Sequence, residues 1–186
     1  MTLRISYFTL ICIAFTSCHQ SSPKEKTVPL TDFERIAEGK RLVNVLGCND
    51  CHSPKKMTDL GPVPNEHLLL SGFPSTNGTN TSIDAPMGWL LFSLDGTRAV
   101  GPWGTSFASN LTPDATGIGS WTLAQFSTAM RKGKYKGMEN GRTLLPPMPW
   151  IGYQELNDNE ISAIFSYLKS IPPIENSVPA PIPPKI

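Results

Sequence analysis

The chain has 186 residues and a mass of 20.3 kDa, which suits one domain with or without tails. Charged residues make up only 17% of it, and its formal net charge is +1, so it lacks the basic field of a general nucleic-acid binder. No apolar run reaches the roughly 18 residues of a membrane-spanning helix, which argues against a permanent span.

Residues 1–17 resemble an export signal: Arg4 gives a positive start, and residues 5–15 are mostly apolar. The run ends in small residues before Cys18, as in a bacterial lipobox, where the cysteine is lipidated and becomes the first residue of the mature protein. We therefore expect a lipoprotein signal peptide over 1–17 and a lipid anchor with a polar tether over 18–30. An uncleaved anchor, or a signal peptide cut elsewhere, is the alternative.

Three later segments are predicted to be helical, because each combines a capping pair with apolar residues at helical spacing. They cover residues 31–46, 122–132 and 157–171, and they stop at a glycine or at a pair of prolines. The capping pairs are Thr31 with Glu34, Thr122 with Gln125, and Asn157 with Glu160.

The first two helices are separated by residues 53–119, which contain nine glycines and seven prolines. Within this stretch, residues 89–94 and 97–100 flank Asp95 and Gly96 and predict a β-hairpin. The remainder is predicted to form turns, and a loop region of this length usually serves a function. The last 15 residues, 172–186, contain six prolines and predict an extended tail.

The sequence Cys48-Asn49-Asp50-Cys51-His52 is C-x-x-C-H, the attachment motif of c-type haem. Two thiols on one helical turn can add to the two vinyl groups of a haem, and the adjacent imidazole then lies beneath the iron. A redox-active thiol pair is a weaker interpretation. A zinc site also fits poorly, because tetrahedral zinc wants four ligands and the chain has only two other histidines, His19 and His67. An export signal agrees with the haem interpretation, because c-type haem is attached outside the cytoplasm.

A low-spin electron carrier needs a sixth iron ligand on the face opposite His52. Met148 is the preferred candidate, because prolines on both sides restrict its loop and lower the entropy lost on ligation. Met138, in a glycine- and lysine-rich turn, and His67 are the competitors, and an open site is a further alternative. Met130 lies at the spacing of the apolar positions of a predicted helix, so we expect it to pack in the hydrophobic core.

The order helix, C-x-x-C-H, long loop, methionine loop and C-terminal helix resembles a class I c-type cytochrome with one haem, over residues 31–172. The likeness extends to the cytochrome domains in haem-containing subunits of bacterial membrane-bound alcohol and aldehyde dehydrogenases. The stretches that carry it are Asn110–Asp114, Thr116–Trp121, Pro146–Trp150 and Tyr167–Pro173.

This resemblance implies a mainly α-helical cytochrome c domain wrapped round one covalent haem c, with a long loop and β-hairpin insertion and a proline-rich tail over 173–186. The methionine of the P-x-M-P loop is the distal ligand in that family, which implies Met148. The family also crosses its first and last helices through a small residue facing an aromatic one, which implies Gly39 against Phe165 or Tyr167.

Two further groups of residues are weaker candidates. Side chains suited to the haem propionates are Trp103, Arg142 and Trp150, although core packing of the tryptophans and solvation of the arginine are the commoner explanations. A basic cluster could dock an acidic redox partner, or simply be a solvated turn. It consists of Arg131, Lys132, Lys134 and Lys136.

The sequence therefore predicts an electron carrier rather than an enzyme, held by lipid on the periplasmic side of a bacterial membrane. Its expected partners are redox proteins: a dehydrogenase, a quinol-oxidising complex or an oxidase. A five-coordinate haem protein, acting as a peroxidase or gas sensor, is the alternative if Met148 does not bind iron. A third possibility is a mainly structural subunit of a larger complex, whose haem is one relay point.

Overall fold

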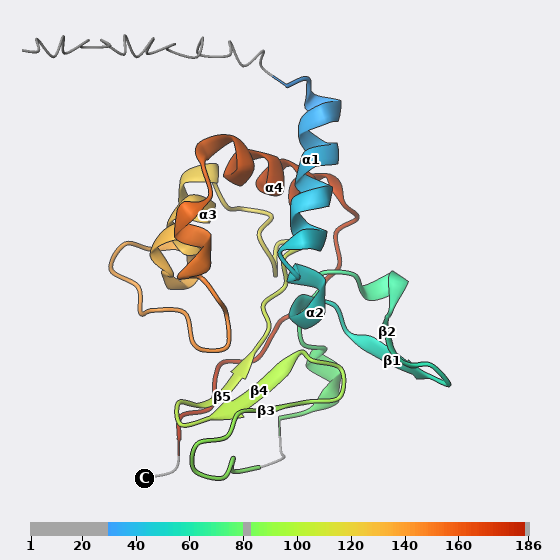
Figure 1. Ribbon diagram of the computed structural model, residues 1–186, viewed down its shortest axis with the longest axis vertical. Helices are drawn as coiled ribbons and strands as arrows, with labels where there is room; N and C mark the ends of the chain where they lie inside the picture. Colours follow the sequence, from blue (N-terminus) through green and yellow to red (C-terminus); the bar gives the residue numbers. More distant parts are fainter. Residues whose placement is uncertain (1–29, 80–82, 185–186) are drawn as a thin grey trace, which may run out of the picture.

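The computed structural model describes residues 30–79 and 83–184. Within them the chain forms four α-helices and two small antiparallel sheets (Figure 1). The helices are α1 (Asp32–Val45), α2 (Cys48–His52), α3 (Leu123–Lys132) and α4 (Asp158–Ser170). The three predicted helices are thus confirmed, and each begins with a capping box in which both hydrogen bonds are formed.

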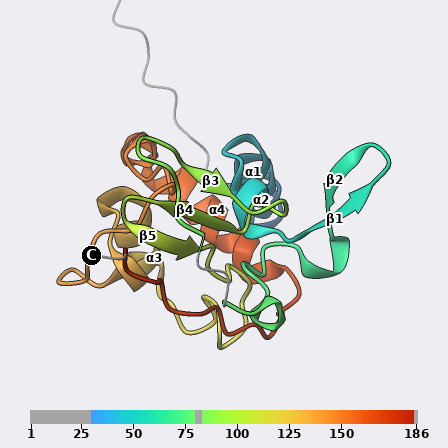
Figure 2. The ribbon, with the colours of Figure 1, turned by 90° about the horizontal axis from the view of Figure 1, so that it is seen from below.

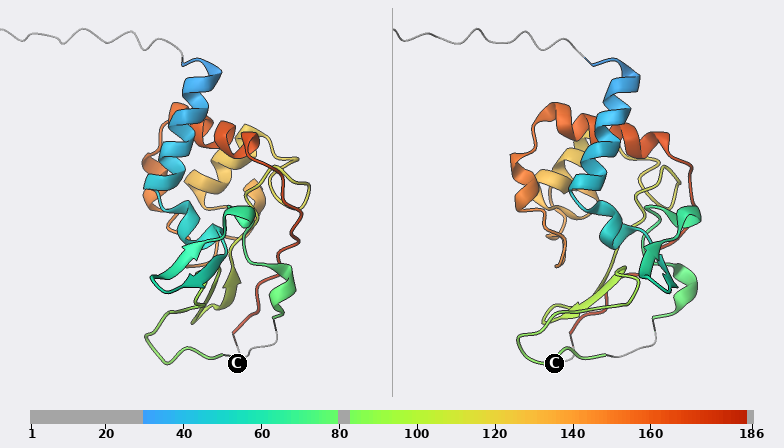
Figure 3. Two further views of the ribbon diagram at one scale, coloured as in Figure 1. Left: turned by 90° about the vertical axis from the view of Figure 1, so that its right-hand side faces the viewer. Right: turned by 45° about the vertical axis from the view of Figure 1, so that its right-hand side comes forward.

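The core forms where α1 crosses α4, as Figures 1 and 3 show. Gly39 lies at the crossing: a Cβ there would overlap the carbonyl of Ala163 and lie 2.8 Å from Cβ of Tyr167. The predicted small-residue crossing is therefore present, with Tyr167 as its aromatic partner. Buried apolar side chains of α1, α3 and α4 surround it: Leu42, Val43, Phe126, Met130, Ile161, Ile164 and Leu168.

A three-stranded sheet lies below α2 in Figure 1 and consists of β3 (Leu91–Phe92), β4 (Arg98–Gly101) and β5 (Gly104–Phe107). The pairing of β3 with β4 confirms the predicted hairpin, whose first strand is shorter than expected. The third strand, β5, was not predicted. It pairs with β4 over four residues, because the turn at residues 102–103 returns the chain directly.

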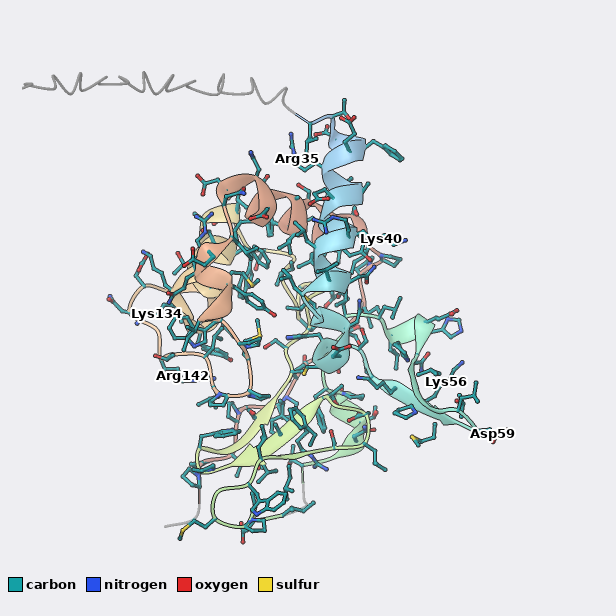
Figure 4. All side chains as sticks on the ribbon, in the orientation of Figure 1. Arg35, Lys40, Lys56, Asp59, Lys134 and Arg142 are labelled. Carbon is teal, nitrogen blue, oxygen red and sulfur yellow. The ribbon has the colours of Figure 1, made fainter. Side chains whose placement is uncertain are left out.

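A second hairpin, β1 (Lys55–Thr58) with β2 (Gly61–Pro64), follows α2 and projects from the body of the molecule (Figure 2). Figure 4 labels Lys56 on β1 and Asp59 at the tip of this hairpin. Sequence reasoning missed it. The prediction of a mainly α-helical domain is thus not confirmed, because the long connection carries more β-structure than expected.

After α4 the chain is extended, as predicted, but it packs against the domain. Residues 172–184, here called the C-terminal strap, run back past the loop before α3 to the sheet (Figure 1). Near its end, Ile182 and Thr105 of β5 exchange backbone hydrogen bonds of 2.8 and 3.0 Å. The strap therefore links the end of α4 to the far side of the molecule.

The predicted signal peptide, Cys18 and all but the last residue of the predicted tether lie outside the described residues. Among the residues that are described, no helix combines the length and apolar character needed to cross a membrane.

Candidate haem-attachment site

The C-x-x-C-H motif forms the short helix α2, which starts directly after α1. Gly47 makes this possible, because its left-handed backbone (φ 70°) turns the chain between the two helices. Cys48 and Cys51 are three residues apart, so their side chains lie on the same side of the helix, and they do not form a disulfide. Burial raises the pKa of Cys48 to about 11 and also raises the pKa of Cys51. Cys48 is therefore a neutral thiol at neutral pH.

The imidazole of His52 is buried and has a defined tautomer. Its Nδ1 lies 2.7 Å from the carbonyl oxygen of Ser109. Because a carbonyl can only accept, Nδ1 carries the proton and Nε2 keeps its lone pair. Burial lowers the pKa of His52, which favours the neutral ring. Two thiols on one helical side and a neutral imidazole with a free Nε2 fit a covalently attached haem.

The backbone around His52 is held by a second set of contacts. Gly72 donates its amide to the His52 carbonyl at 2.8 Å. The hydroxyl of Ser53, which is fully buried, accepts the amide of Leu70 at 2.9 Å and donates to the Asn49 side chain at 2.8 Å. Leu70 and Gly72 both have positive φ, 60° and 79°. A buried leucine keeps such a conformation only where its surroundings enforce it.

Met148 lies in the loop between α3 and α4, which is fastened on both sides of this residue. The carbonyl of Pro146 accepts a 2.6 Å hydrogen bond from Ser106 of β5. Tyr153 donates its hydroxyl to the carbonyl of Leu46, two residues before α2, at 3.1 Å. These two bonds tie the loop to the sheet and to the end of α1. Met148 between them is partly buried against the hydrophobic core.

The other candidate distal ligands differ in burial. Met130 is 6% exposed and belongs to the core, as expected. Met138 is 51% exposed, in the turn after α3. His67 is exposed on a short 3₁₀ turn beyond β2. Of these candidates, only Met148 is both partly buried and attached to elements that flank α2.

The side chains considered for the haem propionates already have partners. The indole N–H of Trp103 donates to Ser106 at 3.2 Å. The ring of Trp150 closes against the left-handed glycine that ends α3. The guanidinium of Arg142 stacks over the ring of Tyr135, 4.0 Å from its centroid. These contacts engage the donors of Trp103 and Arg142, whereas Trp150 is held by packing of its ring.

Two of the four residues of the predicted basic cluster form ion pairs. Arg131 lies 2.7 Å from Asp158, and Lys132 lies 2.7 Å from Glu139. Figure 4 places Lys134 on the loop beside α3, where its ammonium donates to a backbone carbonyl. Carboxylates therefore pair with two of the four charges, and the positive charges of Lys134 and Lys136 are retained.

Sequence reasoning missed the groups that orient the histidine. Ser109 acts through its backbone carbonyl, which any residue could supply, so no side-chain pattern marks it. Gly72 looks like an ordinary turn glycine and Ser53 like an ordinary small polar residue, so neither predicts a contact near His52. Only the close approach of residues 70–73 and 108–111 reveals their role.

Comparison with known proteins agrees with this geometry. The family model for cytochrome c matches residues 36–172. The fructose dehydrogenase cytochrome subunit of Gluconobacter japonicus is 34% identical over 173 residues, which cover 92% of this chain and 28% of that protein. A subunit of nicotinate dehydrogenase from Pseudomonas putida is 40% identical over 80 residues, covering 42% of this chain and 6% of that protein.

The alcohol dehydrogenase (quinone) cytochrome c subunit of Gluconobacter oxydans is 38% identical over 73 residues, covering 39% of this chain and 15% of that protein. The chain thus spans less than a third of the length of these relatives. The resemblance to cytochrome c domains of bacterial dehydrogenase subunits is confirmed by both the family model and the relatives. The chain therefore belongs to the cytochrome c family, and this membership implies covalently bound haem c.

Proposed function

We propose that this chain is an exported, lipid-anchored c-type cytochrome with one haem, which transfers single electrons between membrane redox proteins. The observation that carries the proposal is the arrangement on α2. It combines two free thiols on one side of the helix with a neutral imidazole, whose Nδ1 proton is fixed by the Ser109 carbonyl 2.7 Å from that nitrogen. That arrangement leaves Nε2 free as a proximal ligand.

Each residue has a distinct role in this proposal. Cys48 and Cys51 form the thioether links, His52 is the proximal ligand and Met148 is the distal ligand. The haem iron supplies the one-electron redox couple. The protein keeps the imidazole neutral and correctly oriented, holds the Met148 side chain near the site through the fastened loop, and packs Met148 against the hydrophobic core. Because these contacts restrain both proposed ligands, little of the protein has to move when the iron gains or loses an electron, and the reorganisation energy is small.

A single haem is proposed because this chain contains one C-x-x-C-H motif. The haem content of purified protein, measured by alkaline pyridine spectroscopy against protein concentration, should give one haem per chain. A ratio near two would contradict the proposal.

The proposed partners are redox proteins of the membrane: a dehydrogenase or a quinol-oxidising complex as donor, and an oxidase or another carrier as acceptor. Support comes from the relatives, which are named as cytochrome subunits of fructose and alcohol dehydrogenases. A relay subunit would co-purify with a stable complex, whereas a mobile carrier would be isolated alone.

The lipid anchor is proposed at Cys18, on the periplasmic side, and its support is the sequence of residues 1–18. Residue 30, the first described residue, directly precedes α1, at the opposite end of the domain from the three-stranded sheet (Figure 1). Cys18→Ala should move the protein from the membrane fraction to the soluble fraction. Unchanged partitioning would overturn the anchor.

Absorption spectra of the haem-loaded protein test the distal ligand. The ferric wild type should be low-spin with the weak long-wavelength sulfur-to-iron band, and Met148→Ala should lose it. Met138→Ala is the matched control, because this methionine is 51% exposed and the band should persist. A high-spin wild type that binds carbon monoxide rapidly would instead support a peroxidase or gas sensor.

A further inference from the structure

The C-terminal strap contains one buried amide that contacts a segment more than 100 residues away. The Asn176 side chain donates from Nδ2 to the carbonyls of Ser71 and Phe73, at 2.7 and 2.9 Å. Its Oδ1 accepts the amide of Ser75 at 2.9 Å. Asn176 is only 8% exposed, so these bonds are shielded from water. One side chain thus fixes the backbone at three alternate residues.

The segment fixed by Asn176 is the one that holds the Ser109 carbonyl. The amide of Phe73 donates to Ala108 at 2.9 Å, and the amide of Leu111 donates to Leu70 at 2.8 Å. These bonds lie on either side of Ser109. Between them Gly72 fits so closely that a Cβ there would lie 2.7 Å from the Ser109 oxygen. The position of that oxygen is therefore set by residues 70–73.

The strap also forms hydrogen bonds with the residues that follow Ser109 in the chain. The side chain of Asn110, the next residue, donates to the carbonyl of Ile174 at 2.8 Å. The backbone amide of Asn176 donates to the hydroxyl of Thr116 at 2.9 Å. The strap therefore bridges both backbone segments that meet at the acceptor of the histidine proton.

We propose that Asn176 is a positioning residue for the proximal ligand: through residues 71–75 it holds the Ser109 carbonyl against the Nδ1 proton of His52, and so tunes the reduction potential. This inference rests on the proposed function. A hydrogen bond donated from Nδ1 makes the imidazole a stronger electron donor, which favours ferric iron. Loosening that bond raises the reduction potential.

The alternative is that Asn176 contributes only to stability. In that case its removal lowers the free energy of unfolding, and neither the histidine proton nor the potential changes. Two readouts on folded holoprotein separate these possibilities. One is the solvent exchange of the His52 Nδ1 proton, followed by NMR in the reduced protein, and the other is the midpoint potential.

In Asn176→Ala, we expect the Nδ1 proton to exchange about tenfold faster, corresponding to one weakened hydrogen bond. The midpoint potential should rise while the sulfur-to-iron band of the ferric form is retained. Glu175→Ala is the matched control, because this neighbour on the strap is exposed and both readouts should stay at the wild-type value. Unchanged exchange and potential in folded Asn176→Ala would overturn the proposal.

If Asn176→Ala does not mature, hydrogen exchange of the wild-type holoprotein decides. We expect one opening event to expose three protons to exchange: the amide protons of Ser75 and Gly72 and the ring proton of His52. Their exchange rates should therefore show the same dependence on denaturant. A ring proton that stays protected after the Ser75 amide has opened would overturn the proposal. Failure of the proposed function is distinguishable, because the wild type itself would then lack the spectrum of a histidine-ligated haem.

Discussion

His52 and the proposed distal ligand Met148 are restrained in different ways. The histidine lies on a helix, its ring donates to a fixed carbonyl, and its backbone carbonyl accepts the Gly72 amide. Met148 lies in a loop that is fastened at Pro146 and Tyr153. An imidazole must have the right tautomer and ring orientation, whereas a thioether needs only to be kept near the iron. The chain therefore uses a dense network on one side of the site and two attachment points on the other.

The largest expected effect comes from Gly72→Ala. The added methyl would meet the Ala108 and Ser109 backbone at 2.5–2.7 Å, and φ is 79°. We expect a loss of about 3 kcal/mol in the free energy of unfolding, measured by denaturant titration of the holoprotein. Gly61→Ala is the control, because its φ is also positive but no atom lies within 4 Å, so only about 1 kcal/mol is expected. Equal losses would show that close packing beneath His52 is unimportant.

Ser53→Ala should also lower the free energy of unfolding by disturbing the contacts around His52, but by less than Gly72→Ala. It removes the buried hydroxyl that accepts the Leu70 amide and leaves that amide without its partner. The expected cost is about 2 kcal/mol, by the same denaturant titration. Ser120→Ala changes an exposed hydroxyl and should stay within about 0.5 kcal/mol of the wild type. A Ser53 variant as stable as the control would argue against a dense proximal network.

Ser106→Ala tests the first attachment of the methionine loop. The loss of its 2.6 Å bond to Pro146 should cost about 1 kcal/mol of stability. Added cyanide should also displace the distal ligand faster, as followed by stopped-flow absorption. Ser109→Ala is an informative control, because it keeps the backbone carbonyl on which His52 depends. If both variants bind cyanide at the wild-type rate, the loop is held by other contacts.

Tyr153→Phe tests the second attachment and should have the smallest effect at neutral pH, about 0.5–1 kcal/mol. Burial raises the pKa of Tyr153 to about 12. The unfolded chain titrates near the ordinary value of about 10, so this contribution to stability is complete below pH 10 and is lost as pH rises towards 12. Denaturant unfolding from about pH 8 to 12 should therefore show a smaller alkaline decrease in Tyr153→Phe than in the wild type. Identical decreases in the two proteins would exclude Tyr153 as the source of the alkaline loss of stability.

The three long helices and the position of α2 could be predicted because their signals are local. Thr31, Thr122 and Asn157 each cap the helix that directly follows, and the spacing of Cys48, Cys51 and His52 is dictated by haem chemistry. The residue-specific assignments of Cys18 and Met148 remain predictions. No property of an isolated segment tests them.

The contacts around His52 could not be predicted, because they join segments distant in sequence. Asn176 lies in a proline-rich stretch whose composition predicts an extended path but gives no sign of where that path packs. The β1–β2 hairpin was missed for a different reason. Its strands are mostly lysine, glycine and proline, with one β-branched residue in each, Thr58 and Val63, so local preference argued against them.

The end of the strap has a further consequence, for solubility. Strand β5 lies at the edge of its sheet, and an open edge is a template for pairing with another molecule. Ile182 occupies this edge through its two bonds to Thr105, and the prolines on both sides of Ile182 have no amide proton to offer a further strand. The strap thus covers the β5 edge at Thr105 without adding a further strand. A chain shortened before Ile182 would expose that edge and should aggregate at concentrations where the full chain stays dispersed.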